Sequence, residues 1–183
     1  MKKPLALAVC VIFAACNNNP TVSKTDSTTS APDSGSATKT IQSPYDIMYS
    51  SKFVMDDPKN AESLLAIWKA YDNGDVSKSK DLFADTMTAQ LADGSIMRAS
   101  RDSMLAGLQT FRNSLKSAVD RVDAIMAIKS TDQNEHWALI WGTETDTYKN
   151  GKVDSTHLQE TWRFNKDGKA DLLLQYKRSG TRK

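Results

Sequence analysis

Cysteine and histidine are scarce in this chain, and their scarcity limits the chemistry open to it. The 183 residues include two cysteines, Cys10 and Cys16, and two histidines, His136 and His157. Both cysteines lie near the N-terminus, so the rest of the chain has no disulfide, thiolate nucleophile or cysteine ligand. Two histidines on separate segments, without clustered carboxylates beside them, make a poor metal site. We therefore expect neither a metal nor an organic cofactor.

The N-terminal apolar run is too short to span a bilayer as a mature helix. Residues 5–15 follow a short basic start and end in small residues before Cys16, and they resemble a bacterial lipoprotein signal peptide. The resemblance implies that 1–15 are removed and that Cys16 is lipidated. We then expect a lipid-anchored protein of the bacterial cell envelope that faces the periplasm. The alternative is an ordinary secretory signal with an incidental cysteine.

Neither sign of charge is in surplus once the signal is gone. The chain has 24 Lys and Arg against 22 Asp and Glu, and the loss of Lys2 and Lys3 leaves 22 of each. Without a basic excess, nucleic acid and anionic membrane surfaces are not expected partners. Residues 16–44 are rich in Ser and Thr and have no aromatic side chain. This composition predicts a disordered tether between the lipid and the domain.

Residues 45–183 are predicted to form one α+β domain. After an irregular lead-in over 45–56, apolar residues at helical spacing predict a helix over 58–73 and a shorter one that follows Asp75 and includes Phe83. Two short strands, 86–92 and 95–99, precede a third helix that Ser100 caps. Four long strands then fill 122–177. This order predicts helices gathered on one face of a curved antiparallel sheet.

The turns between the long strands predict which residues share a face. A two-residue turn at Asn150 and Gly151 would pair Trp141 with Glu160. A three-residue loop with a left-handed Gly168 would align Leu174 beside Glu160. Because side chains alternate, Glu160 becomes the one ionisable residue of an apolar inner face. His157 falls on the outer face in this register, either as a solvated pair with Glu144 or as an acid–base couple with it.

The domain resembles the nuclear transport factor 2-like superfamily, which includes SnoaL-type polyketide cyclase-like proteins and ketosteroid isomerases. The resemblance covers 58–178 and rests on the element order and on three stretches, 71–75, 82–85 and 162–169. It implies a cone-shaped antiparallel sheet, also described as a cystatin-like barrel, with three helices over a pocket at its wide end. A homodimer through the outer face of the sheet is also implied. Many different functions occur on this fold, so the resemblance alone does not specify one.

The segment 160–165 is similar to the isomerase strand that carries a buried, protonated acid, and it aligns Glu160 with that acid. The isomerases have an oxyanion-binding tyrosine where this chain has Ile67, and a catalytic base where it has Leu91. Steroid isomerisation is therefore not expected. Glu160 is the candidate catalytic acid, and the alternative is a structural acid paired with a buried hydroxyl or with Arg98.

The predicted pocket combines aromatic and aliphatic side chains with this single acid. Its residues are Trp68, Tyr71, Met104, Leu108, Trp137, Trp141, Glu160, Trp162, Leu174 and Tyr176. Apolar walls with few polar groups favour the binding of a small apolar or amphipathic molecule. A second reading is an enzyme of the cyclase, isomerase or dehydratase kind that uses Glu160 as its acid. A third is a structural or interaction module with a vestigial pocket.

Overall fold

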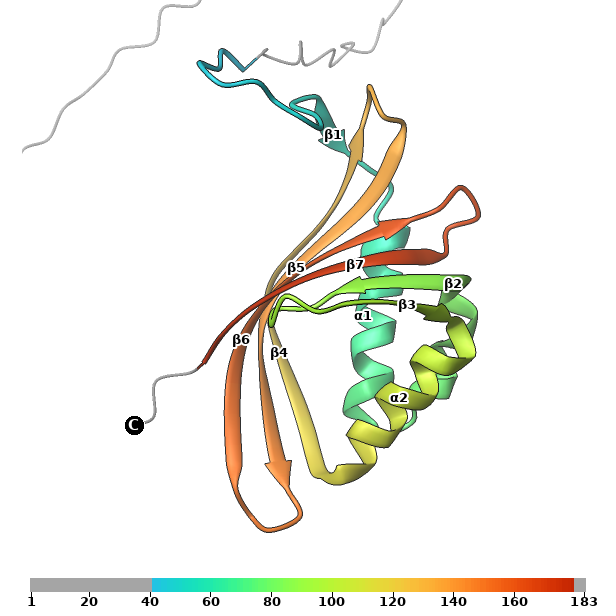
Figure 1. Cartoon of the computed structure of the whole chain (residues 1–183), viewed down its shortest axis with the longest axis vertical. Coiled ribbons are helices and arrows are strands. Elements are labelled where there is room, and N and C mark those ends of the chain that lie inside the picture. Colours follow the sequence, from blue (N-terminus) through green and yellow to red (C-terminus); the bar gives the residue numbers. More distant parts are fainter. Residues whose placement is uncertain (1–40, 180–183) are drawn as a thin grey trace, which may run out of the picture. The chain divides into compact units, whose positions relative to one another are not determined.

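The computed structural model describes residues 41–179, which fall within one compact unit. The predicted signal peptide, Cys16 and the part of the predicted tether up to residue 40 lie outside the described residues. Helix α1 (Lys59–Asp72), the short 3₁₀ helix η1 (Val76–Leu82) and helix α2 (Arg101–Ser114) lie on one side of a curved sheet (Figure 1). None of these helices combines the length and apolarity that crossing a membrane would need.

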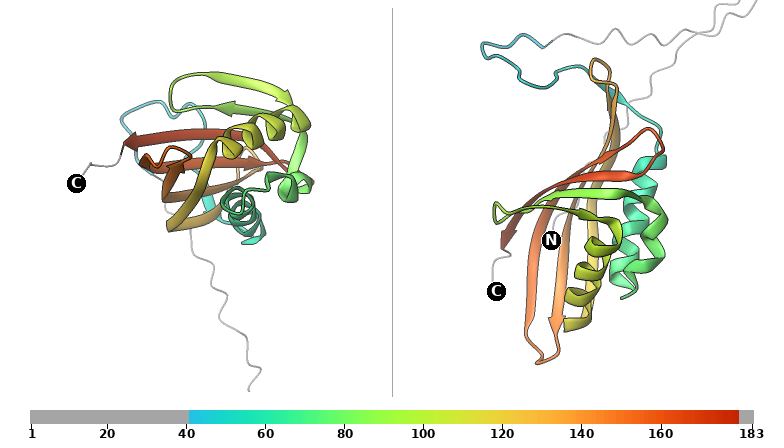
Figure 2. Two further views of the ribbon diagram at one scale, coloured as in Figure 1. Left: turned by 90° about the horizontal axis from the view of Figure 1, so that it is seen from below. Right: turned by 45° about the vertical axis from the view of Figure 1, so that its right-hand side comes forward.

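The sheet has seven strands and curls without closing. The strands are β1 (Phe53–Met55), β2 (Phe83–Gln90), β3 (Ile96–Ser100), β4 (Leu115–Ser130), β5 (Glu135–Tyr148), β6 (Val153–Phe164) and β7 (Ala170–Ser179). Their spatial order is β1-β4-β5-β6-β7-β2-β3. The views in Figure 2 show the curl around the helices. The predicted α+β class and helix-covered, curved sheet are confirmed, with one difference: β2 runs parallel to β7.

Sequence signals and element boundaries agree closely for the helices. The Ser100 side chain accepts a hydrogen bond from the Ser103 backbone N–H and caps α2, as expected. The second helix is a 3₁₀ helix, and Phe83 begins β2 instead of ending that helix. The lead-in contains a strand that the sequence did not reveal, because β1 is three residues long and pairs with the end of β4.

Turn chemistry determines the register of the long strands. Lys166, Asp167 and Gly168 form the predicted three-residue loop, and Gly168 has a φ of 68°. The expected two-residue turn before β6 is wrong. Tyr148 and Lys152 flank a three-residue loop that ends in the left-handed Gly151. The extra loop residue moves the β5–β6 pairing by one position.

The core lies between α1 and the inner, concave face of the sheet. Leu64 and Ile140 are fully buried there, and Trp68 and Trp162 are almost so. Gly142 lets α1 approach β5 closely, since a Cβ at this position would lie 2.9 Å from Cζ3 of Trp68 and 2.6 Å from the carbonyl oxygen of Arg121. A strand glycine is expected where another element comes this near.

Candidate functional site

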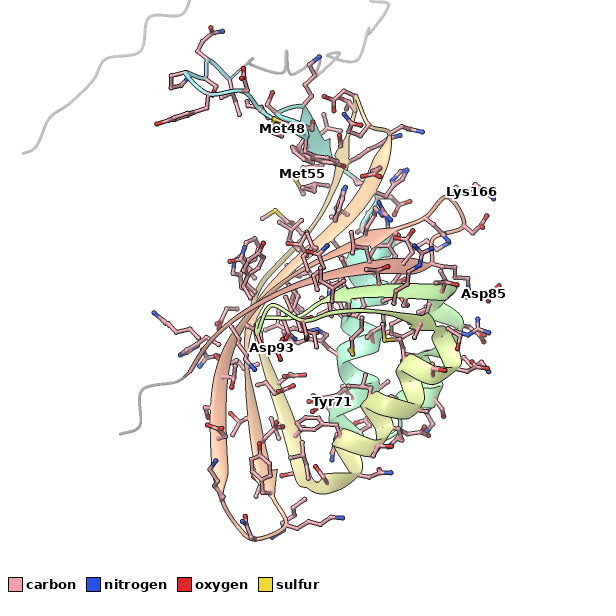
Figure 3. All side chains as sticks on the ribbon, in the orientation of Figure 1. Met48, Met55, Tyr71, Asp85, Asp93 and Lys166 are labelled. Atoms are coloured by element: carbon pink, nitrogen blue, oxygen red, sulfur yellow. The ribbon has the colours of Figure 1, made fainter. Side chains whose placement is uncertain are left out.

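A cavity of about 590 Å³ opens between the two α-helices and the concave face of the sheet. Its wall is mainly apolar and draws on α1, β2, β3, α2 and the four long strands. Tyr71 projects from α1 toward the strands (Figure 3). The lining residues include Ile67, Trp68, Tyr71, Leu91, Ala99, Met104, Gly107, Leu108, Phe111, Asp120, Glu144, Leu158, Glu160, Trp162, Leu173 and Gln175. Leu108 and Phe111 of α2 are 37% and 47% exposed, so this helix forms an open side of the wall.

Glu160 stands in the cavity wall, and both of its carboxyl oxygens accept hydrogen bonds from protein groups. Oε2 accepts from the indole N–H groups of Trp68 and Trp162, both at 2.9 Å. Oε1 accepts from Nε2 of Gln175, also at 2.9 Å. The residue is 5% exposed. Three N–H donors around one buried carboxyl hold two aromatic walls in place, as a structural acid does. Arg98 is exposed and is not among these partners.

Six of the ten predicted pocket residues lie in the cavity wall: Trp68, Tyr71, Met104, Leu108, Glu160 and Trp162. The other four, Trp137, Trp141, Leu174 and Tyr176, lie on the outer, convex face. The observed register pairs Glu160 with Ile140 and with Gln175, so the tryptophans of β5 point the other way. Two local features cause this correction: the three-residue loop before β6 and a bulge after Arg163 in the β6–β7 pair.

Trp137 is buried by the lead-in segment on the convex face. Its indole donates to the Tyr49 hydroxyl at 3.1 Å, and the two rings meet edge to face. Arg163 lies over the same ring and forms ion pairs with Asp171 and Glu135. Tyr176 is 61% exposed, farther along this face. The convex face therefore has a covered end and an exposed aromatic end.

Glu160 is not the only acid on the concave face, contrary to the sequence prediction. Asp120 of β4 and Glu144 of β5 form a directly opposed cross-strand pair, and both line the cavity. Asp146 follows on the same face, opposite Ala118, and is 7% exposed. A bulge at Asp123 reverses the alternation along β4 and turns Asp120 inward. The correct loop count before β6 would have placed Glu144 inward as well.

These acids favour their neutral forms. Burial is the largest cause that raises the pKa of Asp120 to about 7, and the charge of Asp72 adds to it. Burial and the charges of Asp146 and Asp120 raise the pKa of Glu144 to about 8. Burial also raises the pKa of Asp146, against the opposing effect of Arg112. Two half-buried carboxyl groups thus titrate near neutrality inside one cavity.

The two histidines take no part in the cavity. His157 pairs with Thr143, not with Glu144, and its Nδ1 lies 3.1 Å from the Thr143 hydroxyl on the convex face. His136 contacts Asp56 at 2.6 Å. Burial opposes the ionisation of Asp56, but the hydrogen bonds from His136 and the Asp57 backbone, together with the nearby positive charges, lower the pKa of that carboxyl. Within residues 41–179, no three acidic, histidine or cysteine side chains are grouped as metal ligands would be.

Comparison with known proteins identifies the fold. No protein-family model matches the sequence, and no curated protein matches it either. AusH from Aspergillus nidulans superposes with a TM-score of 0.55 at 13% identity, over 71% of this chain and 90% of that one. An epoxide hydrolase-like protein of M. tuberculosis, described as LEH-like, gives 0.55 at 13%, over 66% and 83%.

A third solved structure has the same arrangement. It is a SnoaL-like polyketide cyclase-type protein from Shewanella denitrificans, with a TM-score of 0.55 at 11% identity, over 67% of this chain and 92% of that one. Identities this low establish the shared architecture and leave the chemistry of each protein to its own side chains. With its curled, unclosed sheet wrapped around two helices and a cavity, the chain has the nuclear transport factor 2-like, SnoaL-like fold.

Proposed function

We propose that this domain binds a small amphipathic molecule in the cavity between α1, α2 and the concave face of the sheet. The observation that carries the proposal is an open cavity of about 590 Å³ whose walls are mainly apolar. Cavities of roughly 300–1,000 Å³ with a few placed polar groups are typical of small-molecule sites. Asp120 and Glu144 supply the polar groups here, because the oxygens of Glu160 already accept hydrogen bonds from protein N–H groups.

A neutral fluorescent dye tests this proposal. Nile red should brighten and shift to the blue with the full chain, and Trp68 and Trp162 should report the same event through their own emission. Ala99→Trp places a large side chain in the wall and should weaken dye binding by about tenfold or more. Ala66→Trp adds the same side chain to an exposed position of α1 and should leave dye binding unchanged. Equal binding by both variants would contradict the proposal.

A second candidate function is acid–base catalysis by Asp120 and Glu144. Their pKa values of about 7 and about 8 allow one carboxyl to donate a proton while the other accepts one near neutral pH. This reading replaces Glu160 as the acid. Similarity in fold to epoxide hydrolase-like and polyketide cyclase-like proteins suggests epoxides as first substrates to test. Turnover with a bell-shaped pH profile that Asp120→Asn abolishes would support it.

The membrane tether belongs to the same proposal. Acylation of Cys16 would hold the domain at the envelope, with 17–44 as the spacer. Fatty-acid labelling and membrane fractionation of Cys16→Ser test this part by itself. A Cys16→Ser chain that is unlabelled and still partitions fully with membranes would contradict a lipid anchor at this residue.

A homodimer is the remaining part of the proposal. The exposed end of the convex face, with Trp141, Leu174 and Tyr176, is the surface that we propose for it. Trp141 lies on β5, and Leu174 and Tyr176 lie on β7. Gln159 of the intervening strand β6 pairs with both Trp141 and Tyr176, so the three side chains lie on one outer surface of the sheet.

A further inference from the structure

The charged side chains of the cavity wall are all acidic. Asp120, Glu144 and Glu160 are its ionisable carboxyl groups, and the described lining residues include no lysine, arginine or histidine. The apolar remainder of the wall includes Trp68, Tyr71 and Phe111. A ligand that enters this cavity therefore meets aromatic rings and carboxyl oxygens, and it meets no positive side chain.

Two carboxyl oxygens at this place have no hydrogen-bond partner among the described residues. They are Oδ1 of Asp120 and Oδ1 of Asp146, and both atoms are buried. Asp146 is 7% exposed and sits on the same face as Glu144, two residues along β5. Buried polar atoms normally have a hydrogen-bond partner, so two acceptor oxygens without one beside a cavity indicate a missing donor.

Only other acids form side-chain hydrogen bonds with these two carboxyl groups, Asp72 with Asp120 and Glu144 with Asp146, so a donor is present only while one acid of each pair holds a proton. From α1, Asp72 adds another carboxyl, whose Oδ1 accepts from the Asp120 backbone N–H at 2.9 Å. From α2, Arg112 is the nearest cation, but its guanidinium donates to the carbonyl oxygens of Tyr71 and Asp72 at 2.8 and 3.0 Å. The oxygens of Glu160 on β6 accept hydrogen bonds, so this residue does not supply the donor either.

Like charges directly opposite each other on a sheet are destabilising. Asp120 and Glu144 occupy such a position, with Asp72, Asp146 and Glu160 near them. On α1, the exposed Lys69 pairs with Asp72 at 3.5 Å. Tyr71 of α1 lines the cavity, and burial raises its pKa, so it remains neutral. In addition, Asp154 lies close enough to Asp146 to raise its pKa further. One positive group in the cavity would relieve these repulsions together.

We propose that the ligand of this cavity is an amphipathic cation, namely a protonated amine joined to an apolar body. The inference rests on the proposed function, that the cavity binds a small molecule, and it specifies the class. The ammonium group donates hydrogen bonds to Asp120 and Glu144, and the apolar body packs against Leu158, Leu173 and Met104. The faces of Trp68 and Tyr71 can add cation–π attraction.

This chemistry makes binding depend on pH in one direction. The carboxyl groups with raised pKa must lose protons to pair with an ammonium, so binding releases protons below about pH 8. An alkylamine stays protonated up to about pH 10. The affinity for an amine therefore rises between about pH 6 and about pH 8.5, by roughly tenfold if Asp120 must ionise and by up to about 75-fold if Glu144 must ionise. The affinity for a neutral analogue does not rise over this range.

Three probes of one shape separate the charge from the apolar body. They are phenylbutylamine, phenylbutanol and phenylbutyric acid, each titrated into the full chain by calorimetry at about pH 6 and about pH 8.5. We expect the amine to bind most tightly and the acid most weakly at the higher pH. Titrations in two buffers of different ionisation enthalpy should show net proton release for the amine only.

Asp120→Asn and Glu144→Gln keep the shape of the wall and remove one ionisation each. Each should weaken amine binding by about tenfold or more, and alcohol binding by less than about twofold. Glu62→Gln on the exposed side of α1 is the matched control for the change in net charge and should leave all three affinities unchanged. Thermal unfolding midpoints at or above the parent value would establish that the variants are folded.

The outcomes distinguish the two levels of the proposal. If Nile red binds and the alcohol binds as tightly as the amine at both pH values, the proposal that the ligand is a cation is overturned. The proposal that the cavity binds a small molecule then stands. Nile red binding without any preference for the amine as competitor overturns the cation proposal equally. If neither Nile red nor any of the three probes binds, the proposed function itself fails. Amine preference that is lost in Asp120→Asn and kept in Glu62→Gln supports the assignment.

Discussion

Both faces of the long strands carry aromatic side chains, but these side chains have different surroundings on each face. On the concave face, Trp68 and Trp162 converge on the buried carboxyl of Glu160 beside a cavity. On the convex face, Trp137 is covered by Tyr49 of the lead-in, and Tyr176 is exposed. One face thus uses its aromatic side chains to border a space, and the other uses them to hold a segment of chain. Aromatic residues alone do not reveal which face binds a ligand.

Acidic groups differ between the faces more than aromatic groups do. Glu135 on the convex side is ion-paired with Arg163, which also binds Asp171. Asp120 and Glu144 on the concave side face each other and have no such cation. Acids compensated by a neighbouring cation are structural pairs, whereas uncompensated acids in a cavity have raised pKa values and indicate a functional site. The following five changes test this difference, from the largest expected effect to the smallest.

Glu160→Leu should destabilise the domain most. It leaves two indole N–H groups and the Gln175 amide without their acceptor in a buried place, and we expect a loss of about 3–5 kcal/mol in the free energy of unfolding. Urea unfolding at neutral pH measures it. The matched change on the other face, Glu135→Leu, should cost about 1 kcal/mol or less, because Arg163 retains Asp171 and the site is partly exposed. Equal losses would remove the distinction between the faces.

Gly142→Ala tests how closely α1 lies against the concave face. The added methyl group would lie 2.6 Å from the Arg121 carbonyl oxygen and 2.9 Å from Trp68, so we expect a loss of about 2–3 kcal/mol. Gly107→Ala in α2 adds the same methyl group where nothing lies within 4 Å. It should be neutral or stabilise by up to about 1 kcal/mol. A harmless Gly142→Ala would mean that α1 sits farther from the sheet.

Asp120→Asn should stabilise the fold only where the parent acid is ionised. The folded pKa of about 7 lies above the ordinary 3.8, so the folded state holds the proton more tightly than the unfolded state. The stability contributed by this group is therefore full below about pH 4 and is lost as the pH rises to about 7. We expect the variant to gain about 1–3 kcal/mol over the parent at about pH 8 and little at about pH 4.

Glu144→Gln should show the same direction, with its loss extending to about pH 8. The control is Glu62→Gln on the exposed side of α1, whose difference from the parent should not vary with pH. Thermal midpoints across the pH range measure all three variants. If the stability of the parent rises relative to that of Asp120→Asn between pH 4 and pH 8, the raised pKa values of the buried acid pair would be contradicted.

Tyr176→Lys should have the smallest effect on the folded monomer. The side chain is 61% exposed, so its replacement should change the free energy of unfolding by about 0.5 kcal/mol or less. If the convex face forms the proposed homodimer, the same change should weaken association strongly. Sedimentation velocity over a wide concentration range separates the two effects. A parent chain that stays monomeric at high concentration would contradict the dimer.

Much of the fold could be predicted from the sequence because its signals are local. The cap at Ser100, the helical spacing of Leu64 and Trp68, and the loop that ends in Gly168 each determine an element or a turn by themselves. These features depend on a few neighbouring residues, which sequence patterns describe well.

The cavity wall could be predicted only in part, because the face on which a strand residue lies depends on every turn and bulge between it and its partner strand. Adding Lys149 to the loop of Asn150 and Gly151 reverses which β5 residues share a face with Glu160. The bulge at Asp123 then reverses the alternation along β4. No local pattern in the sequence marks that bulge. The helices supplied correct wall residues because their register does not pass through these turns.

Trp68 has a consequence for the thermodynamics of recognition. Its indole is held at the nitrogen by Glu160, and its six-membered ring rests where Gly142 has no side chain. The ring therefore loses its rotational freedom when the chain folds, and a ligand that later contacts it does not have to immobilise it. Side chains ordered on binding each cost about 0.5–1.5 kcal/mol. This wall of the cavity is already ordered, so it should discriminate between ligands by their shape at little entropic cost.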